Sequence, residues 1–496
     1  MPAVAAGRFQ AGAMAGALRL PFSLCHSPRV VEPIISPWLI LAAGVATIVG
    51  LIIVVKANAF LALLAAALVV SVLAPGEAGD KAARVATAFG TAAGSIGIVI
   101  ALASMVGRSM TESGAADRIV SAFLRAFGER RGDVALVGSG YALSIPIFFD
   151  TVFYLLVPLA RSMTRRTGRH YVRNLLAIAA GACATHTMVP PTPGPLAVAA
   201  NLGVDLGLLM LVGILVAGPA SAVGLLVATW RDRALRIEYR PMPGVDEEAS
   251  AIADGQLPPL GLSLVPILLP VLLIGGHSIL STAASRGVAV PPALASAAAL
   301  AGNANFALLV AAVAALALVQ FTRRPTRERL ASMVEESLMS AGIIILITAA
   351  GGAFGAMLRA ANVGAGVETL FRPGAAGASG VAVLLLAALM SSVFKVAQGS
   401  STVAMLTTSA LFGAMLPGGG LAVHPVYLAL AISGGSLVGT WMNDSGFWIF
   451  AKMGNLTEAE TLGSWTILSA SVGLTGIVLT CVLAWLFPMA PVPVTP

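Results

Sequence analysis

Charged residues are missing from eight long stretches of this chain. No Asp, Glu, Lys or Arg occurs in residues 33–55, 57–76, 85–107, 206–230, 255–285, 287–322, 337–358 or 461–496. A membrane-spanning helix needs about 20 apolar residues, because the hydrocarbon core is ~30 Å thick and each helical residue rises ~1.5 Å. Each stretch is long enough to cross the hydrocarbon core of a membrane as a helix, so the pattern predicts an all-α polytopic membrane protein.

The composition supports this class. Hydrophobic residues make up 58% of the 496 residues and charged residues 10%, whereas soluble domains carry roughly 25% charged residues. The mean hydropathy of +0.92 excludes an ordinary soluble enzyme, and apolar runs far longer than a strand argue against a β-barrel. Cys25, Cys183 and Cys481 are too few and too scattered for a disulfide framework or a metal site. No cofactor is expected, and the net charge of +7 indicates membrane topology rather than nucleic-acid binding.

Three further apolar regions are interrupted at their middle. Residues 134–160 contain Pro146 and Asp150, residues 174–204 contain His186 and the string PPTPGP (190–195), and residues 373–451 contain Lys395, Gln398 and Asp444. Prolines and charges at mid-membrane depth are costly unless the broken backbone lines a cavity. The interruptions therefore indicate a polar site inside the membrane.

Arginine clusters predict the topology. They lie at residues 125–131, 161–173, 231–240 and 323–329, and all four are expected in the cytoplasm. Two of them flank residues 134–160, so this segment is predicted to be a re-entrant hairpin that turns near residues 146–150, while residues 174–204 form a broken transmembrane helix. Residues 231–259 are predicted to be a flexible cytoplasmic linker. Residues 1–32 are expected to form a disordered N-terminal tail and residues 489–496 a second tail.

The two halves of the chain resemble each other at an offset of 248 residues. Pro146 then falls on Phe394, and Asp150 falls on Gln398. The offset predicts a first repeat at 33–230 and a second at 260–488, with a second hairpin at 381–415 and a second broken helix at 427–451. Crossings counted from the arginine clusters run inward at 85–107 and outward at 337–358, so the repeats are predicted to be inverted. Inverted repeats with paired broken segments are typical of secondary transporters that bind substrate at the bilayer midplane.

Four ionisable residues lie deep in apolar segments. Asp150, His186 and Asp444 are the candidates for proton coupling, because intramembrane ionisable groups are functional candidates by default. Each also has a structural alternative: Asp150 and Asp444 precede helical segments and could be N-caps, and His186 could be a core histidine. Lys395 is a candidate for binding an anion, with a structural ion pair as its alternative.

Broken helices also expose backbone N–H groups at half-helix N-termini, which favour an anion such as a carboxylate. Neutral donors and acceptors lie nearby, namely Gln398, Gly399, Ser400, Ser401, Thr192, Asn443 and Ser445. Together with Lys395 they form the predicted substrate site, which suits a polar or polyhydroxylated carboxylate. No Walker A string occurs, so ATP-driven pumping within this chain is not expected.

Four long motifs occur in the order found in one transporter family. They are GYALSIPIFFD (140–150), THTMVPPTPGP (185–195), AQGSSTVA (397–404) and NDSGFW (443–448), with shorter matches at ESGAA (112–116) and FGERR (127–131). Over residues 33–486 the chain resembles the gluconate:proton symporter (GntP) family of the ion transporter superfamily. The resemblance implies inverted repeats, homodimers and elevator motion. It also implies symport of a small hydroxy or sugar-acid carboxylate with protons across the bacterial inner membrane.

Two positions depart from the family pattern. Thr192 replaces the histidine of a His-Pro-Gly-Pro string, and Trp441 replaces the histidine of a Ser-His-Val-Asn-Asp string. The indole of Trp441 is expected to narrow or stiffen the pocket wall, and the replacements leave the identity of the carboxylate open. Two alternatives also remain open: a sodium-coupled carboxylate transporter of the same architecture, and an intramembrane hydrolase built on Ser, His186 and Asp. The protein is otherwise predicted not to be an enzyme.

Overall fold

A computed structural model describes residues 36–128, 131–168, 170–240, 257–285, 287–362, 380–414, 423–442 and 444–489. The predicted tail at 1–32 and residues 490–496 of the other tail lie outside the described residues, as do residues 241–256 of the predicted linker. The described residues form helices and contain no strand, which confirms the all-α class.

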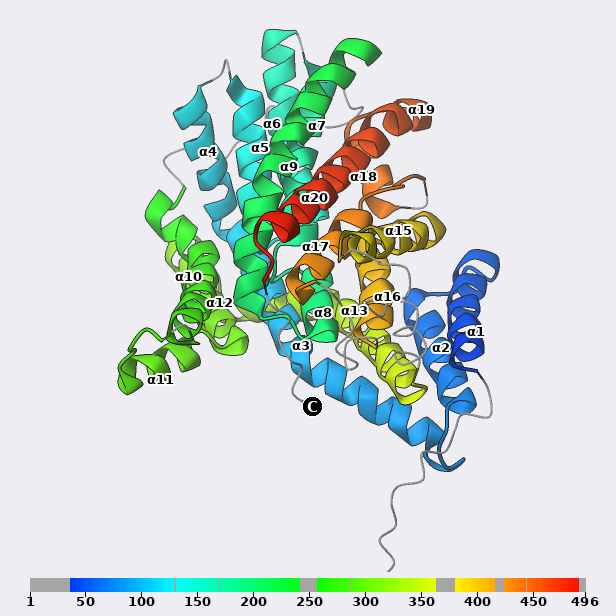
Figure 1. Cartoon of the computed structure of the whole chain (residues 1–496). Helices are drawn as coiled ribbons and strands as arrows, with labels where there is room; N and C mark the ends of the chain where they lie inside the picture. The colour runs from blue at the N-terminus through cyan, green and yellow to red at the C-terminus, as the bar shows by residue number, and fades with distance from the viewer. Residues whose placement is uncertain are drawn as a thin grey trace, which may run out of the picture. The chain divides into compact units, whose positions relative to one another are not determined.

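The first half of the chain contributes nine α-helices to the described structure (Figure 1). They are α1 (Pro37–Val49), α2 (Ala59–Leu73), α3 (Asp80–Ser113), α4 (Ala115–Phe127), α5 (Gly132–Leu143), α6 (Phe149–Thr167), α7 (Tyr171–Met188), α8 (Pro193–Leu202) and α9 (Leu206–Leu235). A π-helical turn at Gly50–Val54 extends α1. The last helix continues five residues beyond residue 230, where the first repeat was predicted to end.

The second half follows in a similar order. Its described helices are α10 (Leu260–Ser285), α11 (Pro292–Ala301), α12 (Ala304–Arg323), α13 (Arg327–Ala360), α15 (Gly380–Gln398), α16 (Ser401–Gly413), α17 (Pro425–Gly435), α18 (Ser445–Met453), α19 (Glu458–Thr461) and α20 (Ile467–Leu486). The π-helical segment η5 (Leu462–Thr466) joins α19 to α20 without a break. Seven described spans are long and apolar enough to cross a membrane: those of α3, α9, α10, α12, α13 and α15, and the continuous α19–α20 span. The multi-pass prediction is confirmed.

Four helix breaks fall in the regions where the sequence predicts interruptions. The breaks lie at residues 144–148 between α5 and α6, 189–192 between α7 and α8, 399–400 between α15 and α16, and 436–444 between α17 and α18. Each break lies inside a segment that the sequence predicts to be a hairpin or a broken helix. Gly399, with φ of +81°, begins the shortest of these breaks, because a left-handed backbone is accessible to glycine without steric cost.

The order of elements recurs between the halves. Helices α3 and α13 are each 34 residues long, and each precedes two interrupted helix pairs and a long last helix, with α4 between α3 and the first pair. This order agrees with the internal repeat seen in the sequence. The opposite orientation of the two repeats in the membrane stays a prediction.

Packing brings the breaks of both halves together. The long helices α3 and α13 pack against each other, α8 packs against α16, and α6 packs against α18 (Figure 1). Helices α5 and α7 pack closely because a Cβ atom on Gly140 or Gly181 would collide with the backbone of the opposite helix. Small residues at such crossings are the usual means of close helix packing in membranes. The second arm of each interrupted segment thus contacts the opposite half of the chain.

Candidate functional site

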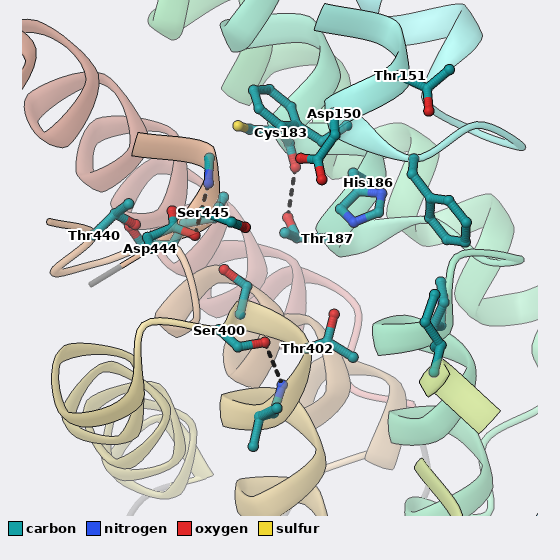
Figure 2. A pocket seen from close by; sticks show the side chains of 18 of the residues that line it. Asp150, Thr151, Cys183, His186, Thr187, Ser400, Thr402, Thr440, Asp444 and Ser445 are labelled. Atoms are coloured by element: carbon teal, nitrogen blue, oxygen red, sulfur yellow. Dashed lines mark hydrogen bonds between the residues drawn. The ribbon is translucent and has the colours of Figure 1, made fainter. Parts of the chain in front are cut away.

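A cavity of about 390 Å³ lies where the helix breaks meet. Its polar lining consists of Asp150, Thr151, Cys183, His186, Thr187, Ser340, Ser400, Ser401, Thr402, Thr440, Asp444 and Ser445. In the view of Figure 2, Ser400 and Thr402 of α16 lie on the opposite side of this space from Asp150 of α6. Among the described residues that line it there is no lysine or arginine, so this lining is acidic and rich in hydroxyl groups.

The N-termini of four helices reach this cavity. Lining residues come from the starts of α6, α8, α16 and α18. The first N–H groups of a helix have no partner within the helix and carry the positive end of its dipole. Four such ends give the cavity a positive backbone potential, which opposes the charge of its two carboxylates.

Asp150 is the second residue of α6, whose N-cap is Phe148. No described residue forms a hydrogen bond or an ion pair with the Asp150 carboxylate, so the structure gives it no capping bond. It faces the cavity beside Thr187 (Figure 2). An ionised carboxylate in such a place is costly unless a proton, a cation or a donor neutralises it.

Asp444, in contrast, has an ion-pair partner and a hydrogen-bond donor. Its Oδ2 lies 3.3 Å from Nζ of Lys395, and its Oδ1 accepts the backbone N–H of Gly446 at 3.2 Å, as an N-cap does. The Lys395 side chain is 1% exposed, and its Nζ also donates to the Gly399 carbonyl at 2.5 Å. Lys395 therefore lies behind the cavity wall, where it ties the turn of the second hairpin to the start of α18.

His186 and Cys183 come from the last turns of α7 and line the cavity together. The ring of His186 stands edge-on to Phe148, with centroids 6.2 Å apart. Its Nδ1 is buried and has no hydrogen-bond partner in the described part of the chain. His186 thus presents a titratable ring to the cavity without being held in a core hydrogen-bond network.

The two positions that depart from the family pattern do not line the cavity. The Thr192 hydroxyl donates to the carbonyl oxygens of His186 and Val189, at 2.8 and 2.9 Å, and so closes the break between α7 and α8. Trp441 is 44% exposed, and its indole N–H donates to the Val396 carbonyl at 3.0 Å. The expectation that the indole narrows the pocket wall is therefore wrong: the ring points away to bind the first arm of the second hairpin.

Other predicted site residues are placed as follows. Ser400, Ser401 and Ser445 line the cavity, whereas Gly399 lies buried at the turn beside them. Gln398 ends α15, and its side chain lies outside the described part of the structure, as does all of Asn443.

Sequence reasoning missed Thr187, Thr440, Ser340 and Trp465 as lining residues. Thr187 lies within the motif at 185–195 and Thr440 shortly precedes the motif at 443–448, so both could have been found from the motifs. Ser340 is a lone hydroxyl within a long apolar helix, and Trp465 lies far from any break, so neither carries a signal in the sequence.

Known proteins match the chain over most of its length. Residues 36–486 match the GntP family permeases. The chain belongs to the GntP permease family. A gluconate permease of Pseudomonas aeruginosa is 32% identical over 90% of this chain and 97% of its own. The inner membrane permease YgbN of Escherichia coli is 32% identical over 89% of this chain and 97% of its own.

The fold of this GntP permease resembles those of two solved transporters. The YdaH transporter of Alcanivorax borkumensis has a TM-score of 0.64 at 15% identity, and it covers 87% of this chain and 98% of its own. The MtrF efflux pump of Neisseria gonorrhoeae has a TM-score of 0.59 at 16% identity, with 92% of this chain and 98% of its own covered. The protein is thus a multi-pass transporter of the bacterial inner membrane and not an enzyme. The hydrolase alternative is excluded by this assignment.

Proposed function

We propose that this permease carries a small hydroxy or sugar-acid carboxylate, gluconate or a close relative, into the cell together with protons. The observation that carries the proposal is the meeting of four helix N-termini around a cavity in which one carboxylate, Asp150, has no partner among the described residues. The helix ends attract an anion, and the unpaired carboxylate supplies a site for the coupled proton.

The start of α16 is the best of the four anchors for the substrate carboxylate. At α6 and α18 an acidic residue already occupies the first turn or the cap. At α8, Pro193 and Pro195 remove two of the first three N–H groups. At α16 the first turn carries neutral hydroxyls, and the N–H groups of Ser401 and Thr402 have no partner within the helix.

Hydroxyl groups around the cavity suit a polyhydroxylated chain. Thr187, Ser340, Thr440 and Ser445 line it from four different segments, and hydroxyls both donate and accept hydrogen bonds. Thr192 and Trp441 lie outside the lining, so their departure from the family pattern gives no reason to exclude gluconate. Relatives at 32% and 30% identity are a gluconate permease and a low-affinity gluconate transporter.

The charge of Asp150 couples substrate binding to proton binding in this proposal. Lys395 compensates Asp444, so Asp150 is left as the uncompensated negative charge when it is ionised. An anion bound in the same small cavity is repelled by ionised Asp150 and accepted once Asp150 binds a proton. Each ligand therefore raises the affinity for the other, which is the thermodynamic requirement for symport. His186, beside Asp150 in the lining, is proposed to exchange this proton with the solvent.

Gluconate uptake into proteoliposomes tests the proposal. A pH gradient, acid outside, should drive accumulation in the complete absence of sodium. Accumulation that needs sodium and ignores the pH gradient would favour the sodium-coupled alternative. We also propose that the protein is a homodimer, as its family resemblance implies, and mass measurement of the detergent-solubilised protein would show a monomer if this is wrong.

A further inference from the structure

A buried arginine joins three separate segments at the end of α6 that lies away from the cavity. Arg161 is 2% exposed. Its guanidinium donates to the hydroxyl of Tyr171, to the Arg240 carbonyl at 2.6 Å and to the Met453 carbonyl at 3.4 Å. The Tyr171 hydroxyl in turn donates to the Gly454 carbonyl at 2.7 Å. We call these groups, with the Tyr239 ring, the Arg161 node.

Two aromatic rings enclose the cation of this node. The guanidinium carbon lies 5.6 Å from the ring centroid of Tyr171 and 5.1 Å from that of Tyr239, and the two rings meet edge-on at 5.4 Å. Arginine fits such a place because its planar fork donates in several directions and stacks on rings, which an ammonium group does not reproduce. Sequence reasoning placed Arg161 in a basic cluster expected in the cytoplasm, and the structure shows that its side chain is buried.

The node fastens together the ends of two helices that begin at the cavity. Helix α6 carries Asp150 in its first turn, ~16 Å from Arg161 at 1.5 Å per residue. Helix α18 begins after Asp444 and ends at Met453, the residue whose carbonyl Arg161 binds. Between these ends the helices contact through Phe153 and Phe450, with centroids 5.5 Å apart.

We propose that Arg161 is a positioning residue that fixes the separation of the two cavity carboxylates, Asp150 and Asp444. This inference rests on the proposed function, because it assigns the node a part in coupling. Asp444 is paired with Lys395, and the electrostatic interaction of Asp150 with this ion pair depends on the distance between them. A shift of α6 against α18 therefore changes how readily Asp150 takes up and releases its proton, although neither carboxylate touches the node.

Arg161→Gln, Arg161→Lys and Tyr171→Phe in the full-length protein test the inference by two measurements. One is the pH dependence of gluconate uptake, with KM and Vmax kept separate. The other is the rate at which N-ethylmaleimide modifies Cys183 in the cavity, measured after Cys25 and Cys481 are replaced by serine, since this rate needs no substrate. Arg233→Gln is the matched control, because Arg233 is exposed in the last turn of α9.

The expected results separate positioning from stability. Arg161→Gln should lower Vmax about tenfold or more, move the midpoint of the pH profile by about half a unit or more, and change the Cys183 rate severalfold. Arg161→Lys should restore part of each change, and Tyr171→Phe should give intermediate values. Arg233→Gln should match wild type.

A purely structural role would contradict the inference. It would show as a lower melting temperature with an unchanged pH profile and an unchanged Cys183 rate per folded molecule. If Arg161→Gln does not fold, the same unchanged values in Tyr171→Phe overturn the inference. Absence of pH-driven uptake in wild type would refute the proposed function instead, while the Cys183 rates still decide on the node.

Discussion

Replacing Lys395 by methionine tests whether this residue neutralises Asp444 or binds the substrate directly. Methionine keeps the length of the buried side chain and removes its charge. Asp444 then remains in the cavity wall without the ammonium that lies 3.3 Å from it in the wild-type protein. The substrate anion would meet a second uncompensated negative charge, in addition to any charge on Asp150.

The expected magnitude follows from Coulomb's law. Two unit charges about 8 Å apart interact by about 2 kcal/mol at an effective dielectric constant of about 20. Lys395→Met should therefore raise the gluconate dissociation constant roughly 30-fold. Breaking a buried ion pair typically costs about 3–5 kcal/mol of folding stability, and we expect the lower end because the Asp444 side chain is 13% exposed.

The decisive variant is the double substitution Lys395→Met with Asp444→Asn. Asparagine caps a helix about as well as aspartate, so the bond to the Gly446 N–H is kept while the charge is removed. The double variant should bind gluconate within about threefold of wild type and recover most of the melting temperature. Equilibrium binding of labelled gluconate and thermal unfolding of the purified protein give both numbers. Weak binding that persists in the double variant would refute this reasoning and assign Lys395 a direct contact with the substrate.

Three further predictions concern the anchor, the loop and the topology. Ser401→Pro should weaken gluconate binding about tenfold relative to Ser401→Ala in the same binding assay. Proline at the first position of α16 removes one backbone N–H while the helix tolerates it, so equal affinities of the two variants would exclude that N–H as a substrate ligand. Trp441→Phe should lower stability by about 1 kcal/mol through loss of the bond to the Val396 carbonyl, without changing gluconate affinity; an altered affinity would place the ring in the substrate path. Single cysteines that replace Arg131 and Thr167, on either side of the first predicted hairpin, should both react with an impermeant maleimide from the cytoplasmic side only. Reaction from opposite sides would show that α5 and α6 together cross the membrane once and do not form a re-entrant hairpin.

The helix breaks were predictable because their signals are local. Pro146, the prolines at 190–195 and Gly399 favour a break where they occur, although single prolines such as Pro158 and Pro219 lie inside unbroken helices. Charge-free runs predicted most of the spans, since a helix in lipid must satisfy its own backbone. Six of the eight runs contain a span, whereas the runs at 33–55 and 57–76 form the shorter helices α1 and α2, and the span of α15 comes from an interrupted region. The GntP family assignment rested on the same local strings, and the match over residues 36–486 confirms it.

Partners distant in sequence were not predictable. The sequence left open whether Lys395 binds an anion or forms an ion pair with Asp444 or Asp150, and the packing of segments 49 residues apart places it 3.3 Å from Asp444. Trp441 occupies a motif position, yet its direction depends on where the Val396 carbonyl lies. Arg161 lies in a run of basic residues, and its burial depends on rings and carbonyls supplied by α7, the segment after α9, and α18.

Proton entry during gluconate uptake tests the central claim most directly. Proteoliposomes that enclose a pH-sensitive dye report acidification of the lumen when gluconate is added outside. Wild-type protein should acidify the lumen in sodium-free buffer, whereas Asp150→Asn should still exchange labelled for unlabelled gluconate without moving protons. Acidification by Asp150→Asn at the wild-type rate, or gluconate entry through the wild-type protein without acidification, would contradict the assignment of Asp150 as the proton-coupling carboxylate.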